Sequence, residues 1–262
     1  MKKIINKLKN LIKRTPLISL YILIKMTFVK PKAQNDEVQI IERLISRFKI
    51  PKSFIEFGFS GWEFNCASLV NEWEGLLVDG DPYNVKIAKI IYSKKITSIC
   101  SWITLSSLDS IFDYAKTRKL GILSIDVDGN DYWFLEKLIE TKPALIIAEY
   151  NSSFGFRPIS VPYDPNFDRI KKHSSGNYFG ASLTAINHLA NLHEYSLIEI
   201  SNSGVNAFFI RRDLMTADDF ELHPQYAFRE KYFTDGTRPS HQFELIKHLP
   251  LVDVISGDKF SI

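Results

Sequence analysis

The sequence predicts an α/β protein with a doubly wound, mostly parallel sheet, and three observations support this fold class. Short, nearly continuous apolar runs recur along residues 53–149, as expected of strands that are buried on both faces. Amphipathic stretches of helical period separate these runs, so the chain consists of repeated strand–helix–strand units. Two later strands are joined by a short turn, which predicts a C-terminal antiparallel hairpin.

The predicted elements follow one another in a regular order. In the N-terminal segment, Asn35 or Asp36 caps a helix over residues 38–48. Strands are then predicted at residues 53–58, 75–79, 95–100, 120–126 and 144–149. Helices are predicted between them, at residues 63–74, 83–92, 105–117 and 131–140. A last helix at 181–193 precedes the hairpin, whose strands are 195–200 and 207–211.

This order divides the chain into three segments. Residues 1–50 form a basic, helical N-terminal arm, residues 51–211 form the sheet domain, and residues 212–262 form a C-terminal cover or partner surface. Within the domain, residues 150–180 contain many aromatic residues but no clear period. Connections of this length in compact domains are usually functional or disordered, and the aromatic content favours a function.

The composition excludes several classes of protein. A hydrophobic content of 45% is too high for a disordered chain. The net charge of +3 conceals a division, because residues 1–32 carry nine basic and no acidic side chains, whereas the remainder is acidic. An acidic body argues against nucleic acid as a partner. Two cysteines, Cys66 and Cys100, cannot form a disulfide framework, so we expect a reduced, cytoplasmic compartment.

The arm contains one apolar run, at residues 17–29. This run is shorter than the roughly 20 residues of a spanning helix, and no small-residue cleavage site follows it. With its nine positive charges, the arm either contacts an anionic membrane at the inner face, or packs on the domain or on a second subunit of a homodimer. We favour packing.

The first candidate binding feature is a glycine turn that follows the first strand. Gly58 and Gly61 lie in this turn, and Asp79 and Asp81 follow Gly58 by 21 and 23 residues, at the end of the next strand. Glycine allows close approach of a ligand, and an acid at this spacing suits a ribose diol, so we predict a nucleoside site. The turn is bulky where a pyrophosphate would lie, and Glu56 adds a nearby carboxylate. S-adenosylmethionine therefore fits better than NAD.

The second feature is a group of carboxylates at two neighbouring strand ends. Asp126, Asp128 and Asp131 follow one strand, and Glu149 ends the next. Such carboxylates either share a proton or bind a cation, so we predict a general base or a hard divalent metal (Mg or Mn) held by Asp126, Asp128 and Glu149. The simpler interpretation is that Asp131 caps a helix and Asp126 holds a loop. His173 is an alternative base, although an ordinary surface histidine is the favoured interpretation.

These residues resemble a known family. The segment 125–129, Ile-Asp-Val-Asp-Gly, together with 107–109 and 148–149, looks like the FkbM-type S-adenosylmethionine-dependent methyltransferases over roughly residues 50–211. Residues 163–165, 178–183 and 204–209 resemble a subgroup associated with bacterial surface-glycan biosynthesis. The resemblance implies a Rossmann-like, seven-stranded, doubly wound sheet with an antiparallel hairpin at one edge, and S-adenosylmethionine as cofactor.

The resemblance also implies roles for single residues. Asp81 would hold the ribose, and Asp126 would close the cofactor site. Glu56, Gly58 and Gly61 would line the methionine part of the cofactor. Ser101 and Trp102 would flank its adenine. This chain departs from the family pattern in having Ser60 within a turn that is usually richer in glycine, and Asp128 where Glu is common.

The leading hypothesis is an O-methyltransferase that acts on a sugar or sugar-nucleotide acceptor in surface polysaccharide (capsule or lipopolysaccharide) biosynthesis. Asp128 is the first choice of base, with His173 and Glu149 as further candidates. The insertion 150–180 would shape the acceptor site. Its pocket residues would be Tyr150, Phe154, Phe156, Arg157 and Tyr178, and Arg157, Lys171 and Lys172 would receive a phosphate if the acceptor is nucleotide-linked.

Two other functions compete with it. An NAD-dependent sugar oxidoreductase or epimerase would need a Tyr-x-x-x-Lys pair beside the cofactor, and the match in this chain is Tyr21 with Lys25, in the arm. A non-catalytic scaffold would use the arm to dock at a membrane surface. The carboxylates at three strand ends argue against this last function.

Overall fold

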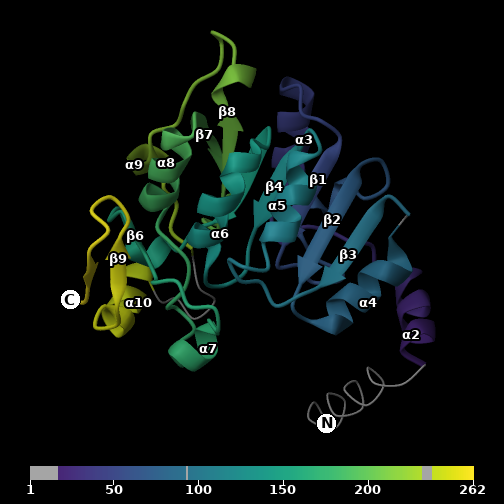
Figure 1. The fold of residues 1–262 in the computed structure, drawn as a ribbon, viewed down its shortest axis with the longest axis horizontal. Coiled ribbons are helices and arrows are strands. Elements are labelled where there is room, and N and C mark those ends of the chain that lie inside the picture. The colour runs from purple at the N-terminus through teal and green to yellow at the C-terminus, as the bar shows by residue number, and fades with distance from the viewer. Residues whose placement is uncertain (1–16, 93, 232–237) are drawn as a thin grey trace.

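The computed structural model describes residues 17–92, 94–231 and 238–262 and contains a seven-stranded sheet of order β3-β2-β1-β4-β5-β8-β7 (Figure 1). The strands are β1 (Ser53–Phe57), β2 (Glu74–Asp79), β3 (Ile96–Cys100), β4 (Ile122–Ile125), β5 (Leu145–Glu149), β7 (Tyr195–Ile200) and β8 (Asn206–Arg211). Strands β1 to β5 pair in parallel, and β8 is antiparallel to both β5 and β7. The predicted fold class and the hairpin at one edge are therefore confirmed.

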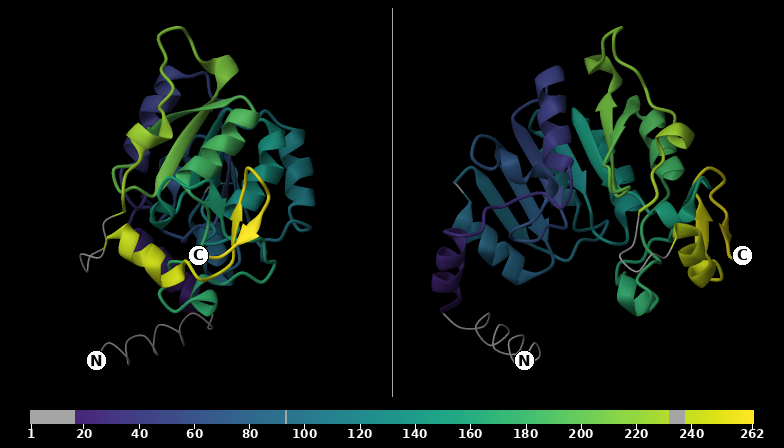
Figure 2. Two further views of the ribbon diagram at one scale, coloured as in Figure 1. Left: turned by 90° about the vertical axis from the view of Figure 1, so that its left-hand side faces the viewer. Right: turned by 180° about the vertical axis from the view of Figure 1, so that it is seen from behind.

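Helices cover both faces of this sheet (Figures 1 and 2). They are α3 (Glu37–Arg47), α4 (Pro82–Ile91), α5 (Asp109–Lys116), α6 (Asp131–Leu138) and α8 (Leu183–Leu192). Successive strand residues face opposite sides, so that Phe54 packs in the cluster with α3 and α4, and Ile55 packs in the cluster with α5, α6 and α8. Both faces are buried, which explains the continuous apolar runs in the sequence.

The helix predicted at residues 63–74 is wrong. The structure has only a short 3₁₀ helix there, η1 (Asn65–Leu69). The buried Glu56 carboxylate accepts hydrogen bonds from the backbone N–H groups of Asn65 (2.6 Å) and Cys66 (2.8 Å), and these bonds fix the segment against β1. The predicted cap at Asp36 is right in position, but its side chain makes no cap hydrogen bond and instead accepts from the N–H of Asn202.

The insertion and the C-terminal segment fold together. Strand β9 (Leu251–Asp253) pairs with β6 (Ile159–Ser160) and with β10 (Lys259–Phe260) in a separate antiparallel sheet. The remaining elements of these segments are η3 (Ser152–Phe154), α7 (Arg169–Lys172), η4 (Arg212–Leu214), α9 (Pro224–Ala227) and α10 (Pro239–Ile246); η2 (Ile139–Thr141) follows α6. The C-terminal segment therefore covers the insertion at one side of the molecule (Figure 1).

Two helices of the N-terminal arm are described: α3, which packs on the sheet, and α2 (Leu17–Met26), which packs on α4. Ile18 and Ile22 are buried in one cluster with Ile87. The basic residues Lys2, Lys3, Lys7, Lys9, Lys13 and Arg14 lie outside the described residues. Among the helices in the described ranges, none is long and apolar enough to cross a membrane.

Candidate functional site

A cavity of about 700 Å³ lies at the carboxyl ends of β1, β2, β4 and β5. The strand order reverses at β1, between β2 and β4, which is where open α/β sheets bind their ligands. The lining of the cavity combines acidic side chains from the strand ends with Arg169 and Lys231 from later segments. Of the residues predicted to bind the cofactor, seven line it: Glu56, Gly58, Asp79, Asp81, Ser101, Trp102 and Asp126.

The glycine turn after β1 is required by close packing. Gly58 has a φ of +72°, and a Cβ at this position would lie 1.6 Å from the backbone oxygen of Asp126. The turn therefore contacts the loop after β4 and holds the two strand ends together. A Cβ at Gly61 would lie 2.6 Å from the Ile87 side chain, so glycine at this position allows α4 to pack closely against the turn. Gly61 is not among the residues that line the cavity.

The two acids after β2 have different environments. Asp79 accepts hydrogen bonds from the backbone N–H of Phe59 (3.1 Å) and of Asp81 (2.6 Å) and from the Asn84 side chain (3.2 Å), so it links the ends of β1 and β2. Burial raises the pKa of Asp79. Asp81 is exposed at the cavity and caps α4 by accepting from the N–H of Tyr83.

Glu56 lies at the floor of the cavity and is 1% exposed. Burial raises its pKa to about 7, against the lowering effect of the N–H bonds from Cys66 and Asn65. Each carboxylate oxygen therefore already accepts one backbone hydrogen bond. Its expected contact with the methionine part of the cofactor stays a prediction.

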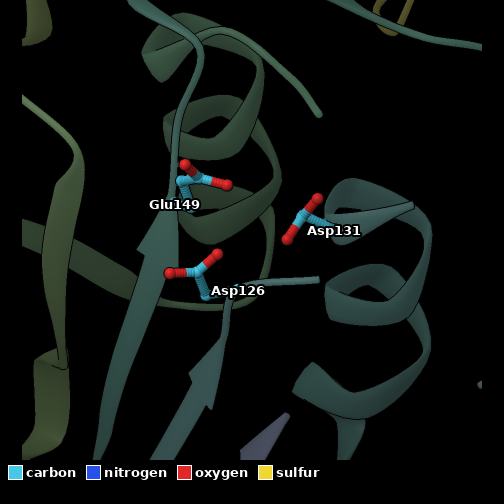
Figure 3. A group of neighbouring side chains, drawn as sticks. All are labelled: Asp126, Asp131 and Glu149. Carbon is cyan, nitrogen blue, oxygen red and sulfur yellow. The ribbon is translucent and has the colours of Figure 1, made fainter. Parts of the chain in front are cut away.

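Three carboxylates converge beside the ends of β4 and β5, and we call Asp126, Asp131 and Glu149 the carboxylate cluster (Figure 3). One oxygen from each lies within 4.8 Å of the others. Asp131 accepts from the N–H groups of Val127 and Gly129, both at 2.8 Å. Glu149 is 5% exposed, and its Oε2 has no hydrogen-bond partner among the described residues.

Burial and mutual repulsion change the acidity of this cluster. The pKa of Asp126 rises to about 8, first through burial and then through the neighbouring charges of Asp131 and Asp128. Burial raises the pKa of Asp131 to about 6, and burial followed by the charge of Asp126 raises the pKa of Glu149 well above its ordinary value. Three like charges in so small a space are stable only with a bound proton or a cation.

The cluster differs from the metal set that the sequence predicted, because Asp131 takes the position expected of Asp128. The Asp128 side chain is exposed, has a backbone φ of +56°, and forms an ion pair with Arg169 at the cavity. The unpartnered Glu149 oxygen and the all-oxygen donor set fit a hard divalent cation. Asp131 was missed as a cluster member because a helix-start position alone explains an aspartate there.

The insertion contributes to the cavity through residues other than those predicted. His173 is outside the lining that the described residues form, and its Nδ1 lies 2.7 Å from Ser175 Oγ. Tyr150, Phe154 and Tyr178 are buried in the core, and Arg157 lies over the Phe243 ring. Lys171 and Lys172 form ion pairs with Asp168 and Asp164. Phe167, Arg169 and Lys231 line the cavity instead.

No local pattern marks these three residues in the sequence. Phe167 and Arg169 belong to the aperiodic insertion, and Lys231 belongs to the C-terminal segment, far from the sheet in the chain. Trp102, which was predicted, is 58% exposed and donates from its indole N–H to the Pro165 backbone oxygen at 2.8 Å. The insertion therefore meets the cavity near the end of β3, at this residue.

Comparisons with known proteins give structural similarity alone. No family model matches the chain, and no curated protein matches it. A methyltransferase from Geobacter sulfurreducens is 15% identical, with a TM-score of 0.40 over 80% of this chain and 96% of its own. A TehB-like SAM-dependent methyltransferase from Corynebacterium glutamicum is 10% identical, with a TM-score of 0.37 over 68% and 88%. The N-terminal domain of EvdMO1, solved with SAH and D-fucose, is 12% identical, with a TM-score of 0.43 over 68% and 82%.

Proposed function

We propose that the chain is an S-adenosylmethionine-dependent O-methyltransferase, and that its acceptor is a sugar or sugar nucleotide of surface polysaccharide biosynthesis. The observation that carries the proposal is one cavity with two separate groups of carboxylates at its ends. Asp79 and Asp81 lie at the β2 end, where a nucleoside would bind, and the carboxylate cluster lies at the β4 and β5 end. A volume of about 700 Å³ is within the range of small-molecule sites.

The charge of the cavity favours this cofactor over NAD. Glu56, Asp79 and Asp81 line its β1 and β2 end, away from the cationic Arg169 and Lys231, and carboxylates there repel a pyrophosphate but attract an ammonium or sulfonium. In our proposal Asp81 holds the ribose, and Ser101 and Trp102 flank the adenine. The Tyr21 and Lys25 of the oxidoreductase motif lie on α2, outside the cavity lining that the described residues define.

Bound S-adenosylmethionine supplies an electrophilic methyl group. The protein must then align a hydroxyl oxygen with that methyl carbon and remove the hydroxyl proton as the C–O bond forms and the C–S bond breaks. We propose Glu149 as the base, in the state in which Asp126 carries the proton that the carboxylate cluster shares, because Glu149 Oε2 is buried at the cavity without a hydrogen-bond partner among the described residues. The ion pair with Arg169 makes Asp128 the second candidate.

A divalent cation is the alternative occupant of the carboxylate cluster. Asp126, Asp131 and Glu149 would hold Mg or Mn, and the ion would lower the pKa of an acceptor hydroxyl. Arg169 and Lys231 are the cationic side chains of the lining, so they are suited to a phosphate on a nucleotide-linked acceptor.

Ligand binding and turnover together test the proposal. S-adenosylhomocysteine should raise the melting temperature and NAD should not, because a ligand stabilises only the folded state that binds it. Asp81→Ala should lose most of that increase. Glu149→Gln should retain it but lower methyl transfer to a panel of sugar nucleotides by at least roughly a hundredfold, as expected for loss of a general base.

Two controls make the outcome decisive. Asp113→Ala changes an acid on α5 outside the cavity lining and should leave binding unchanged. EDTA, followed by added Mg or Mn, shows whether the carboxylate cluster holds a proton or a divalent cation. Methyl transfer should fall with EDTA and recover with added metal only if the cluster holds a cation. Stabilisation by NAD but not by S-adenosylhomocysteine would overturn the proposal.

A further inference from the structure

Helix α2 has one buried and one exposed apolar face. Ile18 and Ile22 are 1% and 0% exposed and pack against α4. Away from this buried face, five large apolar side chains of α2 and Phe28 just after it are 38–84% exposed, and we call them the α2 apolar surface: Leu20, Tyr21, Leu23, Ile24, Met26 and Phe28. Contiguous exposed apolar patches on soluble proteins usually mark contact with a protein or a membrane.

Basic side chains outnumber acidic ones around this surface, where the acids are Glu63 beside Lys32 and Asp81 at the start of α4. Lys30 and Lys32 are exposed just after the helix, and the sequence has no acidic residue before Asp36. Helix α4, on which α2 packs, adds exposed Lys86 and Lys89 and contains no acid between Pro82 and Ile91. The sequence of residues 1–16 contributes six more basic side chains and no acid. An apolar face within a basic region is complementary to an anionic lipid surface.

The chain leads directly from this surface to the cavity. The backbone N–H of Lys32 donates to the oxygen of Trp62, and the N–H of Phe64 donates to the oxygen of Lys32, both at 3.1 Å. Gln34, two residues later, lines the cavity. Helix α2 lies toward the end of the molecule to which β2 and β3 run, and the cavity lies at those strand ends (Figures 1 and 2).

We propose that the α2 apolar surface binds an anionic membrane surface. Its side chains enter the interface between headgroups and acyl chains, while Lys30 and Lys32 contact the headgroup phosphates. A second copy of the chain fits the surface less well, because the basic regions of the two copies would face each other. This contact does not depend on the proposed methyl transfer, and it places the cavity near the membrane.

Co-sedimentation of the full chain with vesicles tests the proposal. The protein should sediment with phosphatidylcholine vesicles that contain phosphatidylglycerol, and much less with phosphatidylcholine alone. The triple variant Leu20→Ser, Leu23→Ser and Ile24→Ser should bind at least roughly tenfold less, because each side chain loses its apolar burial. Lys30→Glu with Lys32→Glu should weaken binding to the anionic vesicles by a similar factor.

The matched control is Leu192→Ser, which removes a 66% exposed leucine at the end of α8 and should leave binding unchanged. All substituted side chains are exposed, so unchanged circular dichroism and melting temperature are expected and verify folding. The proposal is overturned if the triple variant binds anionic vesicles as well as the natural chain does, or if the natural chain does not bind them. A concentration-dependent dimer in light scattering that the triple substitution abolishes overturns it too, in favour of a second copy.

Discussion

At the scale of single residues, buried carboxylates dominate the site. Glu56, Asp131 and Glu149 are at most 5% exposed, and burial raises the pKa of each. Two of them accept backbone hydrogen bonds that hold a neighbouring segment in place: Glu56 holds η1, and Asp131 holds the loop before α6. Glu149 differs because one of its oxygens has no partner among the described residues. That difference is why we assign the chemistry to Glu149.

Glu56 gives a prediction on pH and stability. Its pKa is about 7 in the folded chain against an ordinary value of 4.5. Between these values the folded state keeps a proton that the unfolded state has lost, so raising the pH lowers the free energy of unfolding, by about 3 kcal/mol in total. Glu56→Gln removes this titration. Urea unfolding as a function of pH should therefore show a smaller decrease in the variant.

The control for this prediction is Glu72→Gln, at an exposed carboxylate, which should keep the pH dependence of the natural chain. At acidic pH, Glu56→Gln should have about the same stability as the natural chain, because a protonated carboxyl and an amide each leave one backbone donor less well satisfied. An identical pH dependence in the natural chain and Glu56→Gln would contradict the inferred burial of the charge.

The same residues show how far the sequence could predict the site. Asp79, Asp81, Asp126 and Glu149 could be placed because the carboxyl ends of parallel strands share one edge of the sheet. Arg169 and Lys231 could not, because only tertiary folding of an aperiodic insertion and a distant segment brings them to the cavity.

At the scale of elements, periodicity predicted the strands better than the connections. The hairpin strands were placed within one residue, since buried strands leave a continuous apolar signal. The region of η1 has a helical period but is not a regular helix, because the Glu56 carboxylate holds its backbone. Strands β6 and β9 are only two and three residues long, too short for a pattern to show.

Strand β9 gives the prediction at this scale. Leu251 is 0% exposed and belongs to one buried cluster with Ile159 and Phe167, so β9 is part of the fold around the insertion. Leu251→Ala should lower the free energy of unfolding by about 2–5 kcal/mol, as measured by urea denaturation. Ile255→Ala, at a 60% exposed position in the turn after β9, is the control and should change it little. If Leu251→Ala and the natural chain had equal free energies of unfolding, the C-terminal segment would be only loosely attached.

At the scale of the whole molecule, the basic arm packs against the acidic body through α2, as favoured from the sequence. The sequence separated them by charge and by period, and charge carries no information on packing. In the structure α2 buries Ile18 and Ile22 on α4, and Lys25 lies 4.6 Å above the centre of the Trp62 ring. The arm is therefore continuous with the domain on one face of α2 and free of it on the other.

Deletion of residues 1–32 tests this integration. The deletion exposes Ile87 and removes the burial of Ile18 and Ile22, so it should lower the free energy of unfolding by about 3–6 kcal/mol, at about 1.5–3 kcal/mol for each isoleucine. The triple serine variant of the α2 apolar surface changes only exposed side chains and should keep the natural stability. If urea denaturation gave the same stability for the shortened chain and the natural one, the packing of α2 on α4 would contribute nothing, and the arm would be a separate segment after all.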